Sequence, residues 1–247
     1  MEIGVPSRRT YAKKINLPCA PLKVLNMSES MAHYSVHIGT VQRSLGQNAI
    51  ASAAYNSRSK MSLNVTDKET NITVQFAWDY RNKSGLAYSK IYVPDHVIAD
   101  ASAAEWIYNR ELLWNKAEYA ENRCNAITAG KIMIALPNEF SIAQNVDLID
   151  EIAGELSAFG MIVDCNMHND DENNPHLHIM HTTRELVANR YGELEFSRIK
   201  NRDWQGREWV KFVREFAADK INKHYGLNGF DVRVSHQSYK DQGIDLI

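Results

Sequence analysis

The fold is decided by the stretch Met161–Thr183, which reads MIVDCNMHNDDENNPHLHIMHTT. Two strand-like runs, Met161–His168 and His176–Thr183, flank the polar loop Asn169–Pro175. Short apolar or alternating runs bounded by Asn, Asp and Pro are typical of neighbouring strands. The stretch therefore predicts two strands that can pair with each other across this loop.

Three histidines of this stretch have the spacing of a metal site. Side chains at positions i and i+2 of a strand share a face, so His176 and His178 point together. His168 ends the preceding strand and faces the same cluster if the two strands pair. Three imidazoles on one face of a sheet can hold a divalent ion and leave positions open for a substrate oxygen. His181 breaks the alternation and is assigned to the opposite face.

The histidine pattern alone leaves several interpretations open. A His-x-His pair is more often a plain surface or core feature than a ligand set, and the third histidine brings the two interpretations to about even weight. A metal face would serve a hydrolase, an oxygenase or a structural site. No HExxH motif occurs in the sequence. A facial triad completed by Asp164, Asp170 or Asp171 stays open.

Strand-like and helix-like segments alternate along the rest of the chain. Because several strand pairs have the form of hairpins, the pattern favours an α+β fold with a largely antiparallel sheet covered by helices over a doubly wound parallel sheet. Gly160 and Gly226 follow two of the helices, where glycine is common. The expected strands are His33–Val41, a hairpin over Leu63–Phe76, Tyr88–Val93, Ile132–Leu136, a hairpin over Val187–Phe196, and Val232–Ser235, and the expected helices are Asn48–Lys60, Ser102–Glu121, Ser141–Phe159 and Trp209–Tyr225.

Length and composition indicate a globular, cytoplasmic protein. The 247 residues are 44% hydrophobic, enough to bury a core without disulfides. Three cysteines without a CxxC motif indicate a reducing compartment. The longest apolar run, Ile132–Leu136, is too short to cross a bilayer, so no membrane insertion is expected. Residues 1–30, with three prolines and two basic pairs, are interpreted as an irregular extension, and residues 31–247 as one domain.

Charge is unevenly distributed along the chain. The net charge of −2 argues against a general nucleic-acid binder. Residues 1–60 nevertheless carry eight basic and two acidic side chains, and residues 184–224 carry ten basic and seven acidic ones, on either side of an acidic middle. Charge alone favours ordinary solvated faces over a binding surface.

An ordered set of motifs resembles the MobA/MobL relaxases of mobilisable plasmids, which belong to the histidine–hydrophobic–histidine (HUH) endonuclease group. The likeness spans Met31 to the C-terminus, and the set is specific although each piece alone is weak. The matching pieces are Met31–Tyr34, Arg43–Ala49, Ala53–Tyr55, Asp79–Tyr80, Leu113–Asn115, Ala135–Glu139, His168–Asp171, Asn174–Met180, Thr182–Arg184 and Ser238–Asp245.

The resemblance implies a five-stranded antiparallel sheet and a specific chemistry. Tyr55 would be the nucleophile, and His168, His176 and His178 the ligands of Mg²⁺ or Mn²⁺. The substrate would be single-stranded DNA of a plasmid transfer origin, nicked to leave a religatable 5′-phosphotyrosyl link. Relaxosome accessory proteins and a conjugative coupling protein would be partners in the bacterial cytoplasm. Without the resemblance, Tyr55 would be interpreted as a half-buried aromatic that anchors an Ala-rich helix.

Basic side chains near these motifs are expected to contact DNA phosphates. Each could equally be a solvated surface charge, so the prediction concerns the group. Its members are Arg43, Arg58, Lys60, Lys131, Arg184, Lys200 and Arg202, with Arg198 in the same cluster as the last two.

The chain departs from the family pattern on the strand that leads into Ala135. Lys131 and Met133 stand where relatives commonly carry acids, and Asp164 could substitute for them. Three alternatives to a relaxase stay open, and Lys131 and Met133 support only the second of them. The first is an HUH replication initiator, and the second is a catalytically weakened, origin-binding regulator. The third is a metal-dependent hydrolase that acts through water, for which Tyr55 would be irrelevant.

Overall fold

The structure is a computed structural model that describes residues 30–66, 69–98, 105–170 and 174–237. The chain divides into two units, residues 1–30 and residues 31–247. The irregular extension predicted for the first 30 residues lies, apart from Ser30, outside the described ranges.

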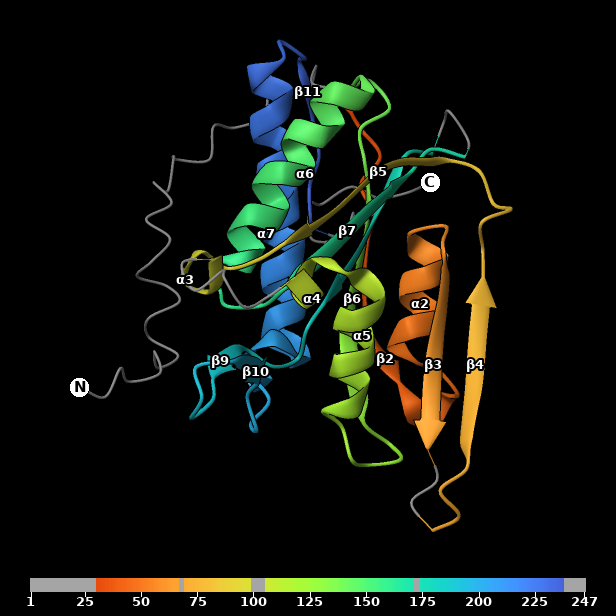
Figure 1. Ribbon diagram of the computed structural model, residues 1–247. Coiled ribbons are helices and arrows are strands. Elements are labelled where there is room, and N and C mark those ends of the chain that lie inside the picture. The colour runs from red at the N-terminus through yellow and green to blue at the C-terminus, as the bar shows by residue number, and fades with distance from the viewer. Residues whose placement is uncertain (1–29, 67–68, 99–104, 171–173, 238–247) are drawn as a thin grey trace, which may run out of the picture. The chain divides into compact units, whose positions relative to one another are not determined.

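Helices and strands alternate through the second unit (Figure 1). The strands are β1 (Ser30–Met31), β2 (Val36–Gln42), β3 (Lys60–Thr66), β4 (Thr73–Asp79), β5 (Leu86–Tyr92), β6 (Ile127–Ala135), β7 (Val163–His168), β8 (His176–His181), β9 (Leu186–Ala188), β10 (Leu194–Phe196) and β11 (Val232–Arg233). The helices are α2 (Ala49–Asn56), α3 (Asp95–Ile98), α4 (Glu105–Tyr108), α5 (Arg110–Tyr119), α6 (Ile142–Ser157) and α7 (Gly206–Leu227), with short 3₁₀ turns η1 (Arg43–Leu45) and η3 (Arg202–Trp204). No helix within these described segments is long and apolar enough to cross a membrane.

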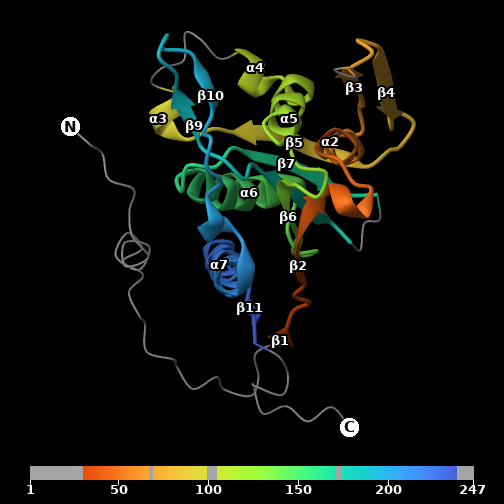
Figure 2. The ribbon, with the colours of Figure 1, turned by 90° about the horizontal axis from the view of Figure 1, so that it is seen from below.

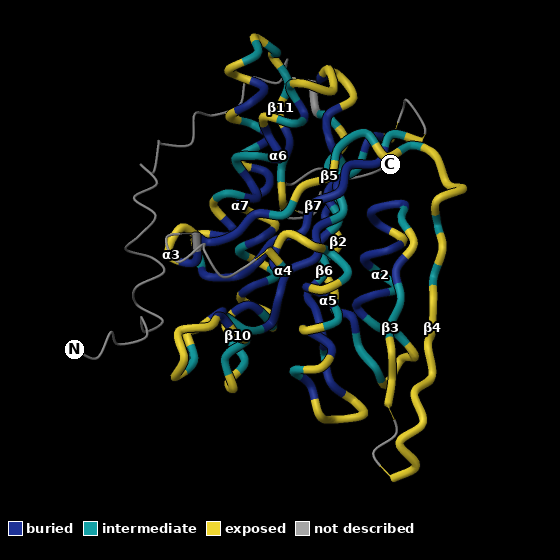
Figure 3. The backbone as a smooth tube through the Cα atoms, viewed as in Figure 1, coloured by how far each residue is buried: buried dark blue, intermediate teal, exposed yellow. Residues whose placement is uncertain are grey.

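A five-stranded sheet forms the centre of the domain, in the order β2-β6-β8-β7-β5. Every neighbouring pair in it is antiparallel. The three middle strands are largely buried, whereas β4 lies exposed at the edge of the domain (Figure 3). The predicted α+β fold with a five-stranded antiparallel sheet covered by helices is confirmed.

Alternation along the strands divides the core between the two faces of the sheet. Ile132, Leu177 and Met167 point to one face and pack with α6 and α7. Ala129 and Met180 point to the other face, where α2 and α5 cover them. Figure 2 shows α7 and α2 on opposite sides of the sheet. The histidines at positions 168, 176 and 178 have the same parity as Met180 along the paired strands, so they belong to the α2 side.

Helix α2 is built to lie close to the sheet. The side chain of Asn48 accepts a hydrogen bond from the Ala51 amide and begins the helix. Ala53 and Ala54 are fully buried, and their small side chains let the helix approach its neighbours. The helix ends at Asn56 and not at Lys60 as predicted. The reason is Arg58, whose φ of 51° is left-handed and cannot continue an α-helix.

Two other helix predictions need correction. The helix expected over Ser102–Glu121 is two helices within the described residues, because Asn109 adopts an extended conformation and caps α5 through the Leu112 amide. Gly226 does not end α7, which continues to Leu227, and the left-handed glycine after that helix is Gly229. The two predicted hairpins are present as β3–β4 and β9–β10.

The N-terminus of α2 is anchored by a buried carboxylate from α5. Glu118 accepts hydrogen bonds from the Ala49 amide at 2.6 Å and from Arg43 at 2.7 Å, and its side chain is 4% exposed. Removing one partner of a buried pair leaves the other charge uncompensated. We expect Glu118→Ala to lower the free energy of unfolding by about 3 kcal/mol in urea titrations. Glu105→Ala, on an exposed site of α4, is the control, and an equal loss in both variants would contradict the anchor.

His181 lies on the far face of the sheet, as predicted. Its ring is 5.7 Å from that of Trp209, and its Nε2 occupies the space that a side chain at Gly130 would need. The residue is 1% exposed, and burial lowers the pKa of the imidazole to about 4. The folded protein therefore keeps His181 neutral in conditions that protonate it in the unfolded chain.

This burial predicts an acid-dependent loss of stability. Between pH 6.5 and about 4 the unfolded state binds the extra proton, so stability falls as pH falls through that window. The shift corresponds to about 3 kcal/mol for His181 alone. We expect His181→Gln to reduce the dependence of the unfolding free energy on pH, measured by urea titrations at several pH values. Other buried histidines should account for the dependence that is left. An unchanged slope would show that His181 does not carry it.

Candidate functional site

The hairpin of β7 and β8 brings the three predicted histidines together. His168 pairs directly with His176 across the two strands, and His178 lies one pair further along the same face. Ring centroids are 5.4 Å apart for His168 and His176, 4.9 Å for His176 and His178, and 4.5 Å for His168 and His178. One ring nitrogen of each histidine lies within 4.8 Å of the others. The predicted juxtaposition is present, and the ligand role remains a prediction.

Backbone carbonyls orient two of the three rings. His168 Nε2 lies 2.6 Å from the Asn56 carbonyl, and His176 Nδ1 lies 2.8 Å from the Asn174 carbonyl. A carbonyl can only accept, so these nitrogens carry the proton, and His168 Nδ1 and His176 Nε2 present lone pairs. Burial, followed by the neighbouring histidines, lowers the pKa of His178 to about 3 and keeps that ring neutral. Three imidazoles whose ring nitrogens lie within 4.8 Å of one another fit a divalent metal ion, provided that Arg58 releases His168 Nδ1.

Tyr55 lies beside this cluster, at the end of α2. Its ring centroid is 6.2 Å from that of His168 and 6.3 Å from that of His178, both edge-on. The tyrosine is 36% exposed, so a ligand can approach it from solvent. The next residue, Asn56, supplies the carbonyl that holds His168. One helix end therefore positions both the tyrosine and a histidine.

Two cations surround the tyrosine ring. The Arg58 guanidinium lies 4.7 Å from the centroid of the Tyr55 ring, and the Lys83 ammonium lies 5.1 Å from it. Arg58 also contacts Asp170 Oδ2 at 2.9 Å and donates to His168 Nδ1 at 3.2 Å. Arg58 Nη1 also donates to the Tyr55 carbonyl at 3.3 Å, so its side chain turns back toward the end of α2. Arg58 was a predicted DNA contact, whereas Lys83 carried no signal in the sequence.

The described acidic residues that were considered as metal ligands form hydrogen bonds or ion pairs with other side chains. The fully buried Asp164 accepts from Arg110 at 2.9 Å, Trp114 at 2.8 Å and Asn166 at 3.0 Å, so its oxygens are satisfied by structural partners. Asp170 pairs with Arg58, and Asp171 lies outside the described residues. The geometry does not favour Asp164 as the substitute acid.

The strand β6 runs directly beside the histidines. Met133 is paired with His178 and Lys131 with Met180, so both residues lie on the histidine face. The two positions at which the family resemblance led us to expect acids are therefore next to the cluster. Lys131 lies two residue pairs beyond Met133 and brings a positive charge to this face.

The other predicted DNA contacts fall into two groups. Arg43 and Arg184 are committed to interior ion pairs, at 2.7 Å from Glu118 and Glu121, and Lys200 is 3.0 Å from Glu121. Lys60 and Arg202 are exposed, in β3 and η3. Arg184, Lys200 and Arg202 line a hollow away from the histidines.

The fold and the site define an α+β protein in which three histidines on an antiparallel sheet lie beside a helix-borne tyrosine. Residues 47–247 match the family described as MobA/MobL. The chain belongs to the MobA/MobL family.

Similar proteins include a conjugal transfer protein TraA from Agrobacterium fabrum (strain C58 / ATCC 33970), which is 31% identical over 240 residues, 88% of this chain and 20% of TraA. A probable mobilization protein MobA from Bifidobacterium longum (strain NCC 2705) is 25% identical over 255 residues, 87% of this chain and 42% of that protein. The chain thus spans about a fifth of the length of TraA. A solved structure on the molecular basis of vancomycin resistance transfer in Staphylococcus aureus is 37% identical, with a TM-score of 0.67, and covers 84% of this chain and 100% of the solved one.

Proposed function

We propose that residues 31–247 form a relaxase domain that nicks one strand of DNA at a plasmid transfer origin. The observation that carries the proposal is the placement of the Tyr55 ring beside His168 and His178, in the cluster that these two histidines form with His176. Membership of the MobA/MobL family supports it, as do relatives named for conjugal transfer and mobilization. A replication initiator has no comparable support among these relatives.

His168, His176 and His178 would hold the metal, with Mg²⁺ or Mn²⁺ as the candidates. A bound divalent ion would withdraw electron density from the substrate phosphate and offset its negative charge. The hydrogen bond from His168 to the Asn56 carbonyl fixes the orientation of that ligand. Imidazole ligands suit Mn²⁺ better than Mg²⁺, which prefers oxygen donors, so Mn²⁺ is the better match.

Tyr55 would carry out the chemical step. Its hydroxyl oxygen forms a bond to phosphorus while the bond from phosphorus to the 3′ oxygen breaks. The tyrosine loses its proton and the 3′ oxygen gains one, which leaves a 3′-hydroxyl and a 5′-phosphotyrosyl link. One phosphoester replaces another, so the reverse reaction reseals the strand. Arg58 and Lys83 place two positive charges beside the entering phosphate.

The proposed activity also implies a substrate and protein partners. A single-stranded substrate suits the site because a flexible strand can bring its phosphate to a partly exposed tyrosine. Relaxosome accessory proteins and a conjugative coupling protein would be partners in the cytoplasm of a bacterium. Lys60 and Lys131 stay candidate phosphate contacts near Tyr55 and the histidines.

Covalent capture tests the proposal. The protein is incubated with a labelled single-stranded oligonucleotide from the cognate transfer origin, in Mn²⁺ or in EDTA, and resolved on a denaturing gel. We expect a labelled protein band in Mn²⁺ that EDTA abolishes. Binding without an adduct under every metal would indicate an origin-binding regulator. Cleavage without an adduct would indicate attack by water.

A further inference from the structure

Arg58 contacts the nitrogen that His168 would offer to a metal ion. His168 donates through Nε2 to the Asn56 carbonyl at 2.6 Å, so its Nδ1 carries the lone pair. Arg58 Nη2 lies 3.2 Å from that Nδ1, and a guanidinium can only donate. The arginine therefore uses the lone pair that the metal site requires from His168.

The same nitrogen of Arg58 is also bound by a carboxylate. Arg58 Nη2 donates to Asp170 Oδ2 at 2.9 Å, and Arg58 Nη1 donates to the Tyr55 carbonyl at 3.3 Å. The Arg58 side chain is 5% exposed, whereas that of Asp170 is 44% exposed. The guanidinium is thus buried between the histidine cluster and the end of α2, and its ion-pair partner stays partly open to solvent.

Gly85, which precedes β5, provides the space that Asp170 occupies. A side chain on Gly85 would begin 1.3 Å from Asp170 Oδ1, and the φ of Gly85 is 85°, in the left-handed region. The Gly85 carbonyl accepts a hydrogen bond from the Asn169 amide at 2.7 Å. The backbone before β5 and after β7 therefore holds Asp170 at a position from which it binds Arg58.

The hydrogen bonding of Arg58 is incomplete in this position. Its Nε is buried and has no hydrogen-bond partner among the residues that the structure describes. A buried donor without a partner raises the free energy of a conformation. The contact of Nη2 with His168 is also longer than its contact with Asp170. A ligand that binds His168 more strongly can therefore displace the guanidinium from it.

Charge acts in the same direction as this contact. Ring nitrogens of the three histidines lie within 4.8 Å of one another, and Arg58 Nη2 is 3.2 Å from one of them. A divalent ion held by these nitrogens and a guanidinium at that place would repel each other. Arg58 thus opposes a metal ion both by occupying His168 and by its positive charge.

We propose that Arg58 is a built-in competitor of the metal ion: its guanidinium occupies His168 Nδ1 in the metal-free protein, and metal binding requires its release. The inference rests on the metal site of the proposed function and adds a restraint on the loading of that site. Removal of the guanidinium should therefore strengthen metal binding. A side chain that helped to hold the metal would have the opposite effect when removed.

Isothermal titration calorimetry of Mn²⁺ into the metal-free protein tests the competition. Arg58→Met removes the guanidinium and keeps an apolar stem beside the Tyr55 ring. We expect this variant to bind Mn²⁺ at least about tenfold more tightly than the unchanged protein, because a hydrogen bond from a charged donor no longer has to be broken. Arg58→Ala carries the same expectation if Arg58→Met does not fold, which thermal unfolding without metal reveals.

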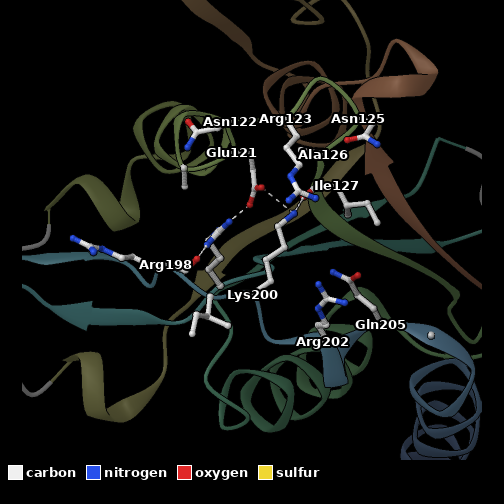
Figure 4. A pocket seen from close by; sticks show the side chains of 14 residues that line it. Glu121, Asn122, Arg123, Asn125, Ala126, Ile127, Arg198, Lys200, Arg202 and Gln205 are labelled. Atoms are coloured by element: carbon white, nitrogen blue, oxygen red, sulfur yellow. Dashed lines mark hydrogen bonds and ion pairs between the residues drawn. The ribbon is translucent and has the colours of Figure 1, made fainter.

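Two matched variants separate the contact with His168 from a general effect of charge. Lys83→Met removes a cation that lies 5.1 Å from the centroid of the same Tyr55 ring, and Lys83 makes no hydrogen bond to a histidine in the described segments. Arg202→Met removes an exposed arginine from the hollow beside the N-terminus of α7 (Figure 4). We expect both variants to change Mn²⁺ affinity by no more than about threefold. A gain in Lys83→Met equal to that in Arg58→Met, or no gain in Arg58→Met, would overturn the proposal.

A double variant tests the rival explanation that loss of Arg58 frees Asp170 to bind the metal. Arg58→Met combined with Asp170→Asn should still bind Mn²⁺ more tightly than Asp170→Asn alone, since His168 is the ligand that is freed. Disappearance of the gain in the Asp170→Asn background would overturn the proposal.

The covalent adduct with an origin strand reports on the proposed function separately. An adduct in the unchanged protein without a gain in Arg58→Met would retain the relaxase and remove the competitor. A gain in Arg58→Met without an adduct in any protein would retain the competitor and remove the relaxase. If Mn²⁺ binds to none of these proteins, both proposals fail.

Discussion

Tyr55→Phe is expected to abolish the covalent adduct with origin DNA, lowering its rate of formation by at least about 10,000-fold. The substitution removes only the hydroxyl group, which is the atom proposed to attack phosphorus. The ring remains, and with it the edge contacts to His168 and His178 and the positions of Arg58 and Lys83. Metal binding and folding should therefore be retained, so the loss can be assigned to the nucleophile. Denaturing gels of single-turnover reactions measure it.

Tyr80→Phe provides the matched control for this experiment. The centroid of the Tyr80 ring lies 5.4 Å from that of the Tyr55 ring, so Tyr80 is the tyrosine packed against the proposed nucleophile. We expect Tyr80→Phe to form the adduct at a rate close to that of the unchanged protein. An adduct that persists in Tyr55→Phe and disappears in Tyr80→Phe would move the nucleophile to Tyr80. Strand cleavage that survives in Tyr55→Phe without an adduct would indicate water as the nucleophile.

The histidine face could be predicted from the sequence because it is a local feature. The alternation of His176 and His178 on one strand and a short polar loop back to His168 specify the geometry almost alone. The antiparallel sheet followed from the same hairpin patterns. Tyr55 is different, because its contact with His168 joins segments far apart in the chain. Only the family resemblance indicated it, and the packing of α2 on the histidine face explains it.

Side-chain pairing between distant segments accounts for most of the features that were not predicted from the sequence. Arg43 was a candidate DNA contact, yet Glu118, which holds it, is 75 residues away. Whether a basic side chain faces DNA or a buried acid depends on such pairing, which residue type does not reveal. Lys83 reaches Tyr55 only because the chain turns after β4. The helix prediction ran past Asn56 because no residue-type rule anticipates a left-handed arginine at position 58.

The second prediction with a large expected effect is that a divalent metal stabilises the folded protein. We expect Mn²⁺ to stabilise the folded protein by about 2.7 kcal/mol when present at a hundred times its dissociation constant. His178→Ala should remove most of this gain, because it deletes one of the three proposed imidazole ligands and two imidazoles hold a divalent ion much less tightly. Mg²⁺ should stabilise the unchanged protein less than Mn²⁺, since oxygen ligands are absent from the three-histidine set.

Thermal unfolding with and without each metal measures this effect without any reference to DNA cleavage. His96→Ala, which changes an exposed histidine of α3, is the control and should keep the full Mn²⁺ response. Because the pKa of His178 is held near 3, protons do not compete for this ligand at neutral pH, and loss of the response in His178→Ala reflects a missing donor. An Mn²⁺ response that is the same in His178→Ala and in the unchanged protein would place the metal elsewhere. It would also remove the electrophilic assistance on which the proposed attack by Tyr55 depends.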